Sequence, residues 1–173
     1  MFGDAYLAII TFMEQGGDVL WLIAALTFLM WTLIFERIWF FQSEHKTMVR
    51  QATERWEGRA ERNSWSAHQV REAIISDASD RITGSLPIIQ TCVALCPLFG
   101  LLGTVTGMIK VFEVMAVSGS GNVRAMAAGV SQATVPTMAG MVGALSGVLL
   151  VTILSRRAAH EVAFLEDSLT MDH

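Results

Sequence analysis

Three long runs without a charged side chain constrain this chain more than any other feature: Val19–Phe35, Leu86–Ile109 and Ala125–Ser155. An α-helix rises about 1.5 Å per residue and the hydrocarbon core of a bilayer is about 30 Å thick, so a crossing needs about 20 apolar residues. The second and third runs exceed that length, and the first reaches it if the helix continues through Ile38–Phe41. The runs therefore predict an all-α integral membrane protein with three transmembrane helices.

The basic residues indicate which side of the membrane each loop occupies. Acidic residues but no Lys or Arg precede the first run. The basic residues between the first two runs are Arg37, Lys46, Arg50, Arg55, Arg59, Arg62, Arg71 and Arg81. Because Lys and Arg concentrate in cytoplasmic loops, the loop 42–86 is expected in the cytoplasm and the N-terminus outside. Arg156 and Arg157 directly follow the third run, which places the C-terminus in the cytoplasm.

Polar stretches and glycines divide the chain into segments. The apolar stretch at the start is too short to span a bilayer, so residues 1–17 are expected to form an interfacial helix on the outer face. The loop 42–86 is expected to hold two helices that extend the first two spans into the cytoplasm, with a turn near Glu61–Ser66. The predicted transmembrane helices are 18–41, 87–117 and 125–155, with an outside turn at 118–124 and a cytoplasmic helix at 156–173.

Small residues recur at three- and four-residue spacing in the second and third predicted spans. A glycine lets the backbone of another helix approach closely, so these positions are expected to pack helices together. They are Gly100, Gly103, Gly107, Gly140, Gly143 and Gly147. The centre of the first span has large side chains and no glycine, which favours a lipid-facing helix on the outside of an oligomer. Glu36 and Arg37, near its end, are expected to anchor it at the membrane interface.

Hydroxyl side chains accompany the small residues. Thr104 and Thr137 are expected at comparable depth on antiparallel neighbours, and Thr134 lies one turn from Thr137. The span 125–155 contains no Asp, Glu, Lys, Arg or His. These features favour two helices that line a pore or cavity in an oligomer. Helix packing alone is the alternative.

Catalytic and metal-binding patterns are missing from the sequence. The glycines do not fit a phosphate-binding or dinucleotide-binding loop, and the four histidines are scattered outside the spans. Cys92 and Cys96 are the only cysteines, whereas a structural zinc site normally takes four ligands. The loop 42–86 has no net charge and so no footprint for nucleic acid. We therefore expect no enzyme, no metal, no cofactor and no nucleic-acid partner.

Two stretches resemble a known family. The sequence LFGLLGTVTGMIKVF at 98–112, followed by GVSQATVPTMAGMVGALSG at 129–147, is similar to the ExbB/TolQ/MotA proton-channel family and especially its ExbB branch. The resemblance covers about residues 85–160. It implies a motor subunit of the bacterial inner membrane with a periplasmic N-terminus. It also implies a homopentameric ring around the transmembrane helices of an ExbD-type partner. It further implies that the ring energises a TonB-type protein for outer-membrane transport.

The resemblance also implies roles for single residues. Thr104 and Thr137 match the family's pore threonines. Relatives often have Glu where this chain has Gln132, so a proton-relay role does not carry over, and Gln132 is expected to line the pore as a polar residue.

Since the runs Leu86–Ile109 and Ala125–Ser155 of the inner spans carry no carboxylate, the titrating acid is expected to come from the partner helix. Two alternatives stay open: a TolQ-like motor of the cell envelope, and a membrane scaffold that conducts nothing.

Overall fold

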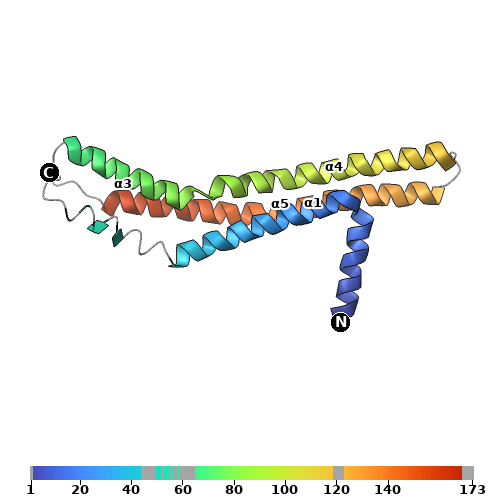
Figure 1. The fold of residues 1–173 in the computed structure, drawn as a ribbon, viewed down its shortest axis with the longest axis horizontal. Coiled ribbons are helices and arrows are strands. Elements are labelled where there is room, and N and C mark those ends of the chain that lie inside the picture. The colour runs from blue at the N-terminus through green and yellow to red at the C-terminus, as the bar shows by residue number, and fades with distance from the viewer. Residues whose placement is uncertain are drawn as a thin grey trace. The chain divides into compact units, whose positions relative to one another are not determined.

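Four long helices carry most of the regular structure of the described residues, and residues 50–51, 53–54 and 56 are also helical. The computed structural model describes residues 2–43, 50–51, 53–54, 56, 58, 65–118 and 123–168. The helices are α1 (Phe2–Ser43), α3 (Trp65–Thr83), α4 (Leu86–Ser118) and α5 (Val123–Ser168) (Figure 1). The all-α prediction is confirmed for this part of the chain. Most of the predicted turn near Glu61–Ser66, the centre of the turn at 118–124, and residues 169–173 lie outside the described residues.

Three stretches of these helices are long and apolar enough to cross a bilayer. They are Gly16–Ser43, Trp65–Val117 and Met126–Ser168. The second stretch runs through α3 and α4, which are separated by a turn at Gly84 and Ser85. The prediction of three membrane-crossing helices is therefore confirmed. The ring-shaped oligomer and the cytoplasmic location of the helix extensions stay predictions.

Helix α1 changes direction at one residue. Gly17 has φ 64° and ψ −163°, and it is the one residue with positive φ in the described part of the chain. Glycine adopts this conformation at little cost because it has no Cβ. Residues 2–16, which we call the N-terminal arm, turn away from the axis of the following part of α1 (Figure 1).

The first of two compact units comprises residues 1–31 and 90–148. In this unit α4 and α5 run antiparallel, since Gly107 lies against Ala133 whereas Gly140 lies against Cys96. Leu20 and Ile23 of α1 are also buried. All the glycines predicted to pack helices lie in this unit, and most of them meet another helix at close range.

The second unit comprises residues 32–89 and 149–173. Its hydrophobic cluster contains Trp56, Ala67, Ala78 and Leu165, with Ile74 and Ile75 packed against it. Arg71 of α3 donates a hydrogen bond from Nη2 to the backbone oxygen of Glu166 in α5 at 2.7 Å. These contacts hold α3 and the end of α5 together.

Candidate functional site on α4 and α5

The glycines of α4 and α5 allow the two backbones to touch. A Cβ atom at Gly107 would lie 2.6 Å from Ala133 Cα, and one at Gly140 would lie 2.5 Å from the backbone oxygen of Cys96. A Cβ at Gly103 would collide with the Pro136 side chain. Real Cβ atoms essentially never come within 3.0 Å of another heavy atom. These glycines therefore lie at close contacts between α4 and α5 of a single chain.

Gly143 and Gly147 also contact α1. A Cβ at Gly143 would lie 3.2 Å from Thr27 Oγ1, and one at Gly147 would lie 2.6 Å from Met30 Sδ. Gly100 belongs with the first group, because its Cβ would lie 3.0 Å from Thr137 Cα. Small residues of α5 thus allow α5 to pack closely against both α4 and α1. We call the tightly packed pair of α4 and α5 the wall.

The three candidate threonines lie on this wall. Thr137 Oγ1 donates a hydrogen bond across to the backbone oxygen of Gly100 at 3.0 Å. Gly100 precedes Thr104 by about one helical turn, so Thr104 and Thr137 lie within about a turn of the same depth. Thr104 Oγ1 donates to Leu101 O at 2.7 Å, and Thr134 Oγ1 donates to Ser131 O at 2.9 Å. Each hydroxyl uses its proton inside the chain and keeps its oxygen as an acceptor for water or a partner.

Gln132 lies on a different side of α5 from Thr134. Two residues along an α-helix are separated by about 200° of rotation, so Gln132 and Thr134 are nearly opposite. The same spacing places Thr106 nearly opposite Thr104 on α4. Thr106 and Gln132 both line a cavity of about 190 Å³ beside Gly17. The structure therefore groups Thr104, Thr134 and Thr137 away from α1, and Gln132 toward it.

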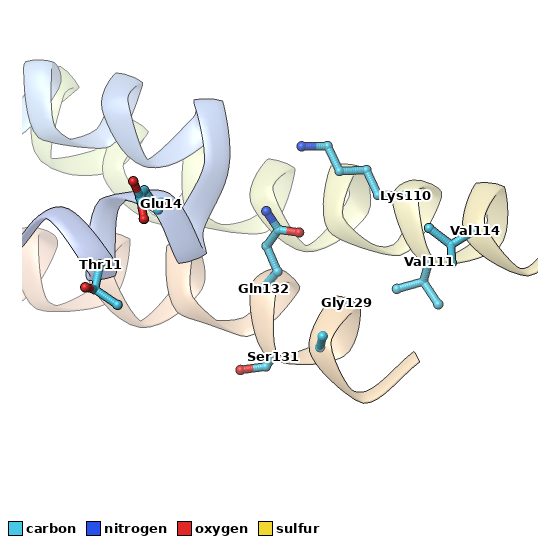
Figure 2. Close-up of a pocket in the computed structure, with 9 residues that line it drawn as sticks. Thr11, Glu14, Lys110, Val111, Val114, Gly129, Ser131 and Gln132 are labelled. Carbon is cyan, nitrogen blue, oxygen red and sulfur yellow. The ribbon is translucent and has the colours of Figure 1, made fainter. Parts of the chain in front are cut away.

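A cavity lined by both polar and apolar residues lies beside the bend of α1. A Cβ at Gly17 would lie 3.5 Å from Gln132 Nε2 and 3.6 Å from Lys110 Nζ, so both nitrogens flank this glycine. A neighbouring cavity of about 540 Å³ adds Thr11 and Glu14 from the N-terminal arm (Figure 2). The sequence analysis did not assign Lys110 to a site. The sequence feature that could have pointed to Lys110 is its place as the first charged residue after the long run Leu86–Ile109.

The chemistry available on the wall is hydrogen bonding without titration. Threonine hydroxyls donate and accept hydrogen bonds but do not change charge near neutral pH. Within the described ranges, no three His, Cys, Asp or Glu residues gather where they could hold a metal ion. The wall can therefore orient water or a polar group of another molecule.

Arg37, predicted to anchor α1 at the membrane interface, is buried within the second unit and is 3% exposed. Its Nη2 donates hydrogen bonds to the backbone oxygens of Arg81, at 2.6 Å, and of Ile82. These oxygens belong to the last turn of α3, where the helix dipole favours a cation. The guanidinium carbon also lies 4.7 Å from the centre of the Phe40 ring. Glu36 is exposed. The position of both residues at a membrane interface stays a prediction.

Replacing Arg37 by Met is expected to loosen the junction between α3 and α4. Each backbone oxygen left without a donor costs about 1–3 kcal/mol when buried, and about 1.4 kcal/mol corresponds to a tenfold change. Amide hydrogen exchange of residues 82–89 should therefore speed up at least about tenfold. The neighbouring Glu36→Gln variant should exchange like the unmodified protein. Equal exchange in all three proteins would show that Arg37 does not hold this junction.

Comparison with known proteins places the chain in a wider context. A profile described as the MotA/TolQ/ExbB proton channel family matches residues 40–167, more than half of the chain. Two relatives from Synechocystis sp. carry the descriptions putative biopolymer transport protein ExbB-like 1 and ExbB-like 3. The first is 39% identical over 70 residues, covering 39% of this chain and 28% of the relative. The second is 28% identical over 82 residues, covering 46% of this chain and 39% of the relative. The chain therefore aligns with less than half the length of either relative.

Proposed function

The chain belongs to the MotA/TolQ/ExbB proton channel family, and we propose that it is an ExbB-like motor subunit driven by the proton motive force. In this proposal α4 and α5 of several copies form a ring around the transmembrane helices of an ExbD-type partner. The ring energises a TonB-type protein for outer-membrane transport. The protein lies in the bacterial inner membrane, with its N-terminus in the periplasm and its C-terminus in the cytoplasm.

The observation that carries the proposal is a packed wall that has hydroxyls but no acid. Thr104, Thr134 and Thr137 lie on α4 and α5, away from α1, within sequence runs that contain no Asp, Glu, Lys, Arg or His. Such a wall can hold water, but it cannot take up and release a proton itself. The titrating carboxylate must then belong to the partner helix inside the ring.

The driving force available to such a complex is substantial. One elementary charge that crosses the membrane yields about 2.3 kcal/mol per 100 mV. A rigid wall transmits this energy to a partner that moves, because the close contacts at Gly107 and Gly140 leave α4 and α5 little freedom to slide. Gln132 lies on the α1 side of α5, close to Lys110 and nearly opposite Thr134, so the proposal gives it no place on the proton path. A TolQ-like role differs in the process that the motor drives rather than in this mechanism.

The proposal is tested by reconstituting the chain with and without its partner. The protein is coexpressed with the product of the adjacent gene, purified as an intact complex and weighed by native mass spectrometry. Vesicles that contain the complex receive a potassium-diffusion potential, and a trapped dye reports internal pH. We expect proton uptake from the complex and none from the chain alone. If vesicles of the intact complex take up no protons, the protein is better explained as a membrane scaffold that conducts nothing. Proton uptake by the chain alone would contradict the proposal that the titrating carboxylate belongs to the partner.

A further inference from the structure

An apolar groove of about 610 Å³ lies between α1 and α5 in the first unit. One wall is formed by α1 residues that include Ile23 and Ala24, and the other by α5 residues that include Met138 and Val142. None of the described residues that line the groove is charged. The groove lies apart from Thr104, Thr134 and Thr137, so the proposed proton path does not use it.

The length of the groove matches one leaflet of a bilayer. It follows α1 from Leu20 to Trp31, which at about 1.5 Å per residue is about 16 Å. Half of the hydrocarbon core of a membrane is about 15 Å. The groove therefore runs from the end of the span that carries the N-terminal arm over about half of the length that a membrane crossing requires.

The N-terminal arm closes the groove at its outer end. Phe12 and Met13 of the arm line the groove, whereas Thr11 and Glu14 line the cavity of about 540 Å³ that Lys110 also lines. The arm thus presents apolar side chains to the groove and polar side chains to the other cavity, as a helix lying in the plane of a membrane interface does. This arrangement agrees with a boundary between hydrocarbon and headgroups at the level of the arm.

We propose that the groove between α1 and α5 binds one hydrocarbon chain of a phospholipid from the leaflet next to the N-terminal arm. A transmembrane helix of a second copy fits poorly, because it would have to continue past Phe12 and Met13 to cross the membrane. A hydrocarbon chain ends at mid-membrane, as the groove does, and needs no partner for hydrogen bonds. Its polar head lies beside the arm, at the level of Thr11 and Glu14.

Two neighbouring alanines allow a matched test. Ala24 lines the groove, whereas Ala25, also exposed, does not. Ala24→Phe should fill the groove and displace the hydrocarbon chain of the lipid, while Ala25→Phe adds the same side-chain volume outside the groove. The full-length protein is extracted in mild detergent, exchanged into lipid-free detergent and weighed intact. We expect one phospholipid per chain in the unmodified protein and in Ala25→Phe, and at least about a tenfold lower occupancy in Ala24→Phe.

A second pair of variants guards against misfolding at position 24. Val142 is 68% exposed and lines the groove, and Met141 is 55% exposed and does not. Val142→Trp should release the lipid while Met141→Trp keeps it, at equal oligomer mass and equal melting temperature. An unmodified protein that carries no lipid would overturn the proposal. Equal lipid loss in Ala24→Phe and Ala25→Phe, and in Val142→Trp and Met141→Trp, would also overturn the proposal. Dissociation of the oligomer by Ala24→Phe, with no lipid bound beforehand, would assign the groove to a second copy of the chain.

Discussion

Replacing Gly140 by Ala is expected to push α4 away from α5, to lower the melting temperature and to reduce the yield of intact oligomer in detergent extracts. The new Cβ would lie 2.5 Å from the backbone oxygen of Cys96 and 3.3 Å from Gly100 Cα. Both of these atoms belong to the backbone, so neither can turn aside. Overpacking of this kind costs about 1–3 kcal/mol, a large share of the about 5–15 kcal/mol that stabilises a typical protein.

The neighbouring glycine provides the control. A Cβ at Gly143 would meet Thr27 Oγ1 at 3.2 Å, which is a side-chain atom that can rotate. We expect Gly143→Ala to change stability by less than about 1 kcal/mol, within the usual range for tolerated substitutions. Thermal unfolding of the two variants and their yield of intact oligomer measure the difference. Equal melting temperatures would contradict the close contact between α4 and α5.

The double variant Thr104→Val, Thr137→Val is expected to reduce transport driven by the proton motive force at least about tenfold while normal amounts of the complex are made. Valine keeps the branched shape of threonine but cannot hydrogen-bond to water or to a carboxyl group of the partner. The Thr137 change also removes the bond to Gly100 O. Such bonds between membrane helices contribute only about 0.6 kcal/mol on average, so the complex should still assemble.

Two further variants separate the hydroxyl from the fold. Thr137→Ser keeps the hydroxyl, and we expect it to retain most of the transport. Ser146 lies on the groove side of α5, and its Oγ donates to Gly143 O at 2.7 Å. Ser146→Ala removes a hydroxyl from the same helix on another side, and transport should be unchanged. If the double variant transports normally, the wall serves assembly and the scaffold is the better account.

The membrane-crossing helices could be predicted because they depend on local composition. An uncharged run of sufficient length must be helical inside a bilayer, where every backbone group needs a partner in its own segment. Gly100, Gly103 and Gly107 could be singled out for the same reason, since their spacing places them near one side of one helix. The spacing alone does not reveal which helix each glycine meets. Gly140 meets α4, but Gly143, a turn later, lies closest to Thr27 of α1.

The candidate site was only partly predictable because its contacts join residues that are distant in the sequence. Thr137 bonds to Gly100, 37 residues away, and Arg37 bonds to Arg81 and Ile82, 44 and 45 residues away. No periodicity within one helix encodes such partners. The sequence analysis placed Gln132 and Thr134 in one group, whereas helix geometry puts them on nearly opposite sides of α5.

By itself the sequence determined that this chain crosses a membrane, that its second and third spans can pack closely, and that the runs Leu86–Ile109 and Ala125–Ser155 carry hydroxyls without acids. These are properties of composition and spacing along single helices. Only the tertiary structure decided that the glycines pack α4 against α5 within one chain. It also decided that the bend at Gly17 brings the N-terminal arm over a groove. The reason is physical: which side of a helix is covered depends on neighbours that the chain supplies from far away.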